Sequence, residues 1–250
     1  MPINPRSYVE SVDIGTIGSL EAASLESGPP LKLDQLPDGV VSGTTLIDFS
    51  AVQSGAVRAG VSLSMLFASR VATKAMQPSD DQDDWLAAYT SSLGQLGFSL
   101  AGTGVIKSTF KKTGLRVHQA IIPFLTVAFG GAAIGPIILA GLKNLQETDK
   151  DQPWITLFDQ ETKRFKAHEL HFAAVSSNES DTSIRYAVAR LNVEFSETSI
   201  LFFKISDAEA EFESATTTMS ANNGLLAVME EDLKSRLGAL TKSFIAAAEI

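Results

Sequence analysis

Residues Ala120 to Leu142 read AIIPFLTVAFGGAAIGPIILAGL and carry no charged side chain in 23 positions. One straight helix of that length would span roughly 35 Å, enough to cross a hydrocarbon core of about 30 Å. Gly130-Gly131 and Pro136 argue against a single helix, because glycine loosens the backbone and proline removes a donor. The stretch therefore predicts two short apolar helices, near 118–129 and 136–145, joined by a glycine-rich corner. We call this pair the apolar hairpin.

The charge around the apolar hairpin is one-sided. The chain has a net charge of −9, yet residues 85–146 contain five basic residues and no Asp or Glu. Basic groups beside an apolar surface favour an anionic lipid interface by about 1 kcal/mol each. A buried segment beside a sheet also excludes carboxylates. The pattern therefore fits both a core hairpin and a hairpin that contacts a membrane.

If the apolar hairpin meets lipid, its large apolar side chains and the basic residues beside it are the expected contacts. These candidates are Lys107, Lys111, Lys112, Arg116, Ile121, Ile122, Phe124, Leu125, Phe129, Ile134, Ile137, Ile138, Leu139 and Lys143. His118 is expected to occupy an ordinary helix position, with pH sensing near pH 6 as the alternative.

Upstream of the hairpin, residues 1–44 are rich in Pro, Gly and Ser and show no sustained period. They predict an irregular N-terminal arm, with room for a short strand or two, ahead of a single domain over residues 45–250. Apolar residues at helical spacing predict a long buried helix over 51–76, with Ser50 as its N-cap, and a second helix over 83–96.

Strands are predicted on both sides of the hairpin. Residues 97–112 are expected to be extended, with a turn at 101–104. The later predicted strands are 153–158, 163–175, 183–195 and 199–219, the last opening on the run 200–203. Residues 221–250 predict an amphipathic closing helix.

Two groups of helices each need an apolar surface to cover, and a sheet has two faces. The predicted fold class is therefore α+β. We expect a single-domain α/β/α sandwich whose mainly antiparallel sheet has about 4–6 strands and is flanked by helical hairpins.

No pattern commits the chain to catalysis, a cofactor or a metal. There is no nucleophile elbow, phosphate loop or dinucleotide fingerprint, and there is no cysteine. His168 and His171 are three apart in a predicted strand, so they point to opposite faces instead of sharing a metal. The acidic row Glu209, Glu211 and Glu213 is typical of a solvated face. We expect a non-enzymatic protein with no cofactor.

Charge and the start of the sequence bear on partners and localisation. The net charge of −9 argues against nucleic-acid binding, which needs clustered basic residues. The sequence MPINPRSYVESVD has neither the basic nor the apolar region of a secretory signal. Localisation stays open, including release or export by a non-classical route.

Residues 120–219 resemble the Cyt-type cytolysins, pore-forming proteins in which helical hairpins wrap an antiparallel sheet. The similar features are the apolar helical pair, the segment PWITLFDQET, two alternating strands, and the segment ILFFKISDAEAEF. The layout also looks like the Erwinia virulence factor type of protein, which is lipidated on a cysteine. This chain has no cysteine, so that mechanism does not transfer.

The resemblance implies a protein that is soluble in water, meets membranes and rearranges to insert. We therefore expect a membrane-active toxin or virulence-type protein. Two alternatives remain open from the sequence. One is a soluble module that binds a lipid or another apolar ligand, and the other is an interaction or assembly protein, including a homo-oligomer.

Overall fold

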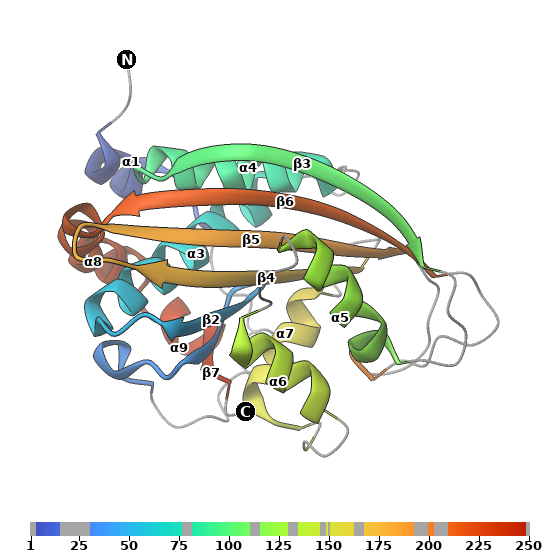
Figure 1. Ribbon diagram of the computed structural model, residues 1–250. Helices are drawn as coiled ribbons and strands as arrows, with labels where there is room; N and C mark the ends of the chain where they lie inside the picture. The colour runs from blue at the N-terminus through green and yellow to red at the C-terminus, as the bar shows by residue number, and fades with distance from the viewer. Residues whose placement is uncertain are drawn as a thin grey trace.

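The computed structural model places one sheet between two layers of helices (Figure 1). It describes residues 4–15, 31–76, 82–110, 116–129, 135–145, 149, 151–162, 168–192, 200–202 and 210–248. The helices are α1 (Pro5–Ser11), the 3-10 turn η1 (Leu33–Gln35), α3 (Gly55–Ala75), α4 (Gln82–Gln95), α5 (Val117–Ala128), α6 (Pro136–Asn144), α7 (Pro153–Thr162), α8 (Asn223–Leu237) and α9 (Leu240–Phe244). The strands are β1 (Gly39–Ser42), β2 (Thr45–Ala51), β3 (Ser99–Phe110), β4 (His168–Ser177), β5 (Asp181–Asn192), β6 (Ala210–Asn222) and β7 (Ile245–Ala247).

The sheet has the strand order β3-β6-β5-β4-β2-β1-β7. Neighbours pair antiparallel except β2 and β4, which run parallel. The predicted α+β sandwich with a mainly antiparallel sheet is confirmed. The sheet is wider than the four to six strands expected, because the short strands β1, β2 and β7 extend it beyond β4. Strand β1 lies in the predicted N-terminal arm, where a short strand or two was allowed for.

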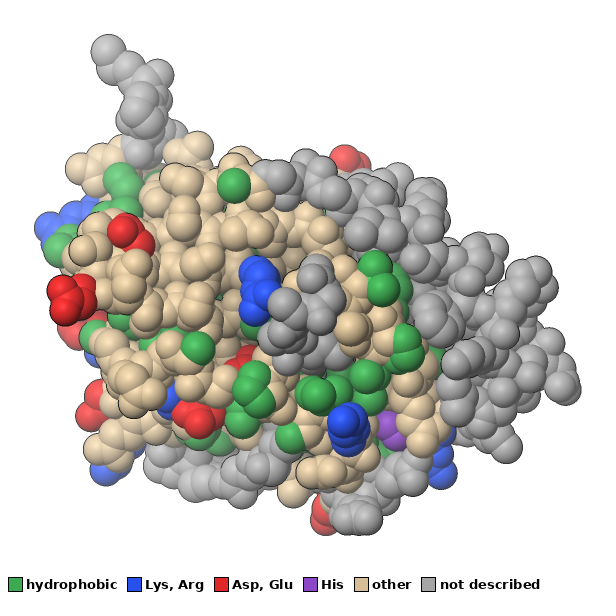
Figure 2. Space-filling view, viewed as in Figure 1, with side chains coloured by type: hydrophobic (Ala, Val, Ile, Leu, Met, Phe, Trp, Pro, Cys, Tyr) green, Lys and Arg blue, Asp and Glu red, His purple; other side chains and the backbone are tan. Residues whose placement is uncertain are grey.

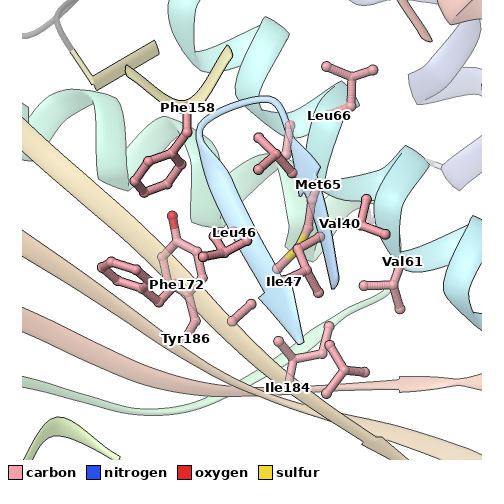
Figure 3. Packing of buried hydrophobic residues seen from close by; sticks show 14 of the residues in the cluster. Val40, Leu46, Ile47, Val61, Met65, Leu66, Phe158, Phe172, Ile184 and Tyr186 are labelled. Atoms are coloured by element: carbon pink, nitrogen blue, oxygen red, sulfur yellow. The ribbon is translucent and has the colours of Figure 1, made fainter. Parts of the chain in front are cut away.

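Each face of the sheet is covered by its own group of helices. Helices α5, α6 and α7 lie on one face, and α3, α4 and α8 lie on the other (Figure 1). Alternate strand residues point to opposite faces, so β2 contributes to both cores. Ile47 of β2 lies toward Val61 and Met65 of α3 (Figure 3). Leu46 is paired with Phe172 of β4, whose ring packs 5.8 Å from that of Phe158 in α7.

Helix α3 confirms the predicted long buried helix, but it begins later than expected. Strand β2 continues to Ala51, so Ser50 belongs to the strand and is not a helix cap. Ser54 takes that role, and its side chain accepts a hydrogen bond from the N–H of Val57. Helix α4 matches the second predicted helix.

Residues 153–158 form a helix, not the predicted strand. Pro153 is the first residue of α7, a position where the missing N–H of proline costs nothing. Trp154, Ile155, Leu157 and Phe158 are buried together on one side of that helix. A short apolar run fits a buried strand and a buried helix equally well, and the flanking proline was the signal that separates them.

Two other strand predictions also need correction. Residues 99–110 form one strand, β3, with a register shift between Ala101 and Thr103 where a turn was expected. Residues 200–202 form a buried turn, and β6 begins only at Ala210. The register shift falls on small residues and the turn on three large apolar residues, and neither run is long enough to show a clear period. The predicted strands at 163–175 and 183–195 correspond to β4 and β5 where the structure describes them.

The closing helix is also shorter than predicted. Asn222 caps α8, its side chain accepting hydrogen bonds from the N–H groups of Gly224 and Leu225. Gly238 has a φ of 51°, a backbone conformation that ends α8 and that glycine adopts without strain. The chain then forms α9 and the edge strand β7.

The two helices of the apolar hairpin are confirmed as α5 and α6. Pro136 stands at the first position of α6, and the corner residues 130–134 lie outside the described part of the chain. Pro123 lies inside α5, on its exposed side.

The sandwich predicts a large effect for Phe172→Ala. Phe172 is fully buried where β4 meets α7, so truncating it should lower the free energy of unfolding by about 3–5 kcal/mol. Urea denaturation followed by circular dichroism measures this. Val228→Ala is the control, since Val228 of α8 is 53% exposed and its truncation should change stability by less than about 0.5 kcal/mol. Equal effects of the two substitutions would contradict the packing.

Candidate functional site

The apolar hairpin rests on the sheet through its inner side. In α5 the buried residues are Val117, His118, Ala120, Ile121, Phe124 and Leu125. In α6 they are Ile138, Gly141 and Leu142. Helix α5 packs over β5, β6 and β3, and α6 packs against β2. In this state the hairpin is part of the core of the sandwich.

The opposite side of the hairpin faces solvent and is also apolar. Pro123, Thr126 and Val127 of α5 are exposed, and the side chain of Ile122 is half-buried beside them. Val127 is 61% exposed, the largest fraction among the exposed large hydrophobic residues of the described chain. Figure 2 shows hydrophobic side chains gathered over α5 and α6 with a basic side chain beside them. We call Ile122, Pro123, Thr126 and Val127 the outer surface.

The residues predicted to contact lipid differ in their exposure to solvent. Ile121, Phe124, Leu125, Phe129 and Ile138 are buried against the sheet. The half-buried ones are Arg116, Ile122, Ile137 and Leu139, and Lys143 is exposed. Lys107 lies in β3 opposite Glu213 of β6, and its side chain is not described. Lys111, Lys112 and Ile134 lie outside the described residues.

A buried carboxylate holds the start of α6. Asp48 of β2 is 1% exposed, and its Oδ2 accepts a hydrogen bond from the backbone N–H of Ile137 at 2.7 Å. Its Oδ1 accepts from the N–H of Ser50 at 2.8 Å. Gly135 makes this approach possible, because a Cβ at that position would lie 2.1 Å from Asp48 Oδ2. The negative charge of Asp48 is also favourable here, because the N-terminus of a helix is the positive end of its dipole.

A basic side chain holds the end of α5 in the same way. Arg185 of β5 donates from Nη1 to the carbonyl oxygen of Phe129, the C-terminal cap of α5, at 3.3 Å. Asp48 and Arg185 belong to one row across the sheet, since both pair with Ala174 of β4. Each charge has the sign that its helix end favours. We call Asp48 and Arg185 the polar clamp.

His118 lies at the other end of the hairpin, in the first turn of α5. Its ring is fully buried, and its Nδ1 is 2.7 Å from the carbonyl oxygen of Leu201. That carbonyl also accepts the backbone N–H of His118 at 3.2 Å. The ring of Phe202 packs edge-on against the imidazole. His118 therefore attaches the start of α5 to the buried turn at 200–202. This contact distinguishes it from a residue that only contributes to the helix.

The opposite face of the sheet holds a buried polar cluster that we interpret as structural. Glu169 accepts two hydrogen bonds from Arg190, at 3.0 and 2.8 Å, and its other oxygen lies 3.1 Å from Nε2 of His171. His171 Nδ1 bonds to the hydroxyl of Tyr186. Burial raises the pKa of the Tyr186 and Tyr89 hydroxyls, so both stay protonated at neutral pH. Glu169, His171 and Tyr186 are all buried in the sandwich.

Within the described residues, no group of three or more His, Cys, Asp or Glu side chains is arranged to hold a metal ion. No helix in the described part of the chain combines the length and the apolar character needed to cross a membrane.

No protein-family model matches the sequence, and no curated protein matches it. Among solved structures, the chain is similar to a delta-endotoxin, at 12% identity and a TM-score of 0.40, over 78% of this chain and 86% of that one. It is also similar to the Evf virulence factor, at 13% identity and a TM-score of 0.33, over 84% of each chain. The sequence pattern resembles the same two kinds of protein, a toxin and a virulence factor. The similarity to these solved structures concerns the fold alone.

The polar clamp is the part of the site that sequence reasoning missed. Asp48 and Arg185 are 137 positions apart and sit in strands that are not neighbours. Asp48 alone carried a signal, because a charged residue inside the apolar run Leu46–Phe49 needs a buried partner. Of the outer surface, Ile122 is among the predicted lipid contacts, whereas Pro123, Thr126 and Val127 were missed, since Pro123 and Val127 look like core residues in a uniformly apolar stretch.

The clamp predicts that Asp48→Ala loosens α6 locally. In α6 the backbone N–H of Ile137 loses its acceptor, at about 1–3 kcal/mol, so amide exchange over residues 136–144 should accelerate by about 5- to 150-fold. Gly135→Ala should act in the same direction, because the added Cβ displaces the Asp48 carboxylate. Hydrogen–deuterium exchange measures both variants.

The control for the clamp is Glu179→Ala, which removes an exposed carboxylate in the turn between β4 and β5. It should leave exchange over residues 136–144 unchanged. An Asp48→Ala variant in which α3 and α6 accelerate equally would show that Asp48 stabilises the whole fold and not the hairpin in particular.

Proposed function

We propose that this protein is a non-enzymatic, membrane-active protein of the toxin or virulence type, and that it binds the surface of a lipid bilayer through the apolar hairpin. One observation carries the proposal. Helix α5 is apolar on its inner side, which packs on the sheet, and apolar on its outer surface, which faces solvent. A helix that is apolar all round normally lies inside a protein or in a membrane.

The charges around the hairpin suit an anionic bilayer. No acidic residue occurs in α5 or α6, while Arg116 precedes α5 and Lys143 stands in the last turn of α6. Lys111 and Lys112 lie close in sequence. Each basic group near an anionic surface adds about 1 kcal/mol, and the local balance acts at short range because salt screens the more distant acidic segments.

The lengths of the helices favour a position in the bilayer surface over a crossing. With 12 and 9 residues, α5 and α6 extend about 18 Å and about 14 Å, short of a hydrocarbon core of about 30 Å. An apolar helix that lies in the plane of the interface buries one side about 5–10 Å deep. Ile122, Pro123 and Val127 would enter first, because they already face solvent.

Deeper insertion requires the hairpin to leave the sheet. The polar clamp opposes this step, because its two hydrogen bonds to the hairpin must break. Once they break, Phe124, Leu125 and Ile138 can exchange the sheet for acyl chains with little change in the polarity of their surroundings. The clamp would therefore set the threshold between a bound state and an inserted state.

The proposal predicts that Val127→Asp weakens binding to vesicles made of phosphatidylcholine and phosphatidylglycerol. A charged residue on the outer surface must be desolvated at the interface, at about 1.4–3 kcal/mol, so the partition coefficient should fall at least about tenfold. Co-sedimentation measures binding, and release of a trapped dye measures insertion.

Val228→Asp is the matched control, because Val228 is also an exposed valine on a helix, at 53% against 61% for Val127. It should bind vesicles as the unmodified chain does. If the unmodified chain binds no vesicles across these lipid compositions, the proposal fails. If Val127→Asp instead separates a dimer into monomers and leaves vesicle binding intact, the outer surface serves assembly.

A further inference from the structure

His118 is placed where a positive charge is hard to accommodate. The Nδ1–H donates to the carbonyl oxygen of Leu201, so the neutral ring carries its lone pair on Nε2. Nε2 is buried and has no hydrogen-bond partner among the described residues. Protonation at Nε2 would therefore create a buried cation with an unsatisfied donor.

The backbone around the ring makes the cation still less favourable. His118 is the second residue of α5, where the helix dipole presents its positive end. Arg116 is two residues away and adds a like charge. Among the described residues, the ring bonds to the Leu201 carbonyl oxygen, and that oxygen is already used by Nδ1 and by the backbone N–H.

Among the described residues of the elements around His118, no acid is bonded to Nε2. On α7, Asp159 binds the backbone N–H of Ile200 at 2.7 Å, and Glu161 is buried in the same helix. Neither bonds to the imidazole. The β5 residues on the α5 face of the sheet near this end are Ala187, Ala189 and Leu191, which do not titrate.

We propose that His118 is an acid-sensitive release for the apolar hairpin: protonation of its buried ring breaks the contact with the turn at 200–202 and frees the start of α5 for lipid. This inference rests on the proposed function, because it assigns a regulator to the same hairpin. It also complements the polar clamp, which holds the corner end of the hairpin while His118 holds the opposite end.

The direction of the pH effect follows from burial. Burial lowers the pKa of His118 below its ordinary value, the Leu201 carbonyl opposes this, and Arg116 adds to the lowering. The packed state thus binds the proton less well than the released state. The contact stabilises the packed hairpin fully above about pH 6.5, the ordinary value, and this stability is lost as the pH falls through the lowered pKa.

Hydrogen–deuterium exchange of the full chain at pH 7.5 and pH 5.0 tests the release without lipid. After correction for the chemical pH dependence of exchange, protection of residues 117–128 should fall at least about tenfold at pH 5.0. A tenfold loss of protection corresponds to a loss of about 1.4 kcal/mol in local stability. Residues 82–95 of α4 report on the other face of the sheet and should not change. They serve as the control inside each sample.

Two variants separate titration from packing. His118→Asn retains a donor toward Leu201 and does not titrate, while His118→Phe retains the ring against Phe202. In whichever variant keeps α5 protected at pH 7.5, the acid response of residues 117–128 should disappear. An acid response equal to that of the unmodified chain, or no response in the unmodified chain, would overturn the proposal.

Vesicle binding at the same two pH values distinguishes this proposal from the proposed function. If α5 opens in acid through His118 and no vesicle binds at either pH, the release exists and the membrane function fails. If vesicles bind equally well at both pH values, the membrane function holds and the release is wrong. The joint proposal expects at least tenfold tighter binding at pH 5.0, abolished in the variants.

Discussion

The contact between the Asp48 carboxylate and the first turn of α6 is the interaction on which the placement of the apolar hairpin depends. The segment from Ala120 to Leu142 contains no charge, so hydrophobic contact alone would hold it on the sheet without fixing its direction. Asp48 and Arg185 supply that direction, since they lie in one row of the sheet and bond to opposite helix ends. Gly135 is required because any side chain there would occupy the space of the carboxylate.

The two faces of the sheet are held by different kinds of contact. Under α4, Glu169, Arg190, His171 and Tyr186 form a hydrogen-bonded network, which ties β4 to β5 and resists local opening. Under α5 and α6 the contacts are almost all apolar, with the polar clamp and His118 as the directional bonds described there. Apolar contacts transfer from protein to lipid at little cost, whereas a buried charge network does not. The hairpin is therefore the element best suited to exchange its partner.

The sequence predicted this hairpin well because periodicity and a proline mark its two helices directly. Helices α3 and α4 and strands β4 and β5 were predicted for the same reason. The predictions for short apolar runs were wrong. The apolar side chains Trp154, Ile155, Leu157 and Phe158 and the residues 200–202 are buried, and burial removes the polar alternation that would separate helix, strand and turn. The parallel pairing of β2 with β4 and the contacts of Asp48, Arg185 and His118 join distant segments. No local pattern specifies such contacts, so only the three-dimensional structure shows them.

The central claim is that the outer surface of α5 touches lipid. The chain has no cysteine, so a single cysteine at Val127 or at Val228 can carry an environment-sensitive fluorophore at one known place. Vesicles of phosphatidylcholine and phosphatidylglycerol that contain a spin-labelled, quenching lipid then report contact directly. The proposal predicts that the fluorophore at 127 shifts to shorter wavelength and is quenched by the labelled lipid, while the fluorophore at 228 does neither. Equal quenching at both positions, or none at 127 when the protein is bound, would contradict the account.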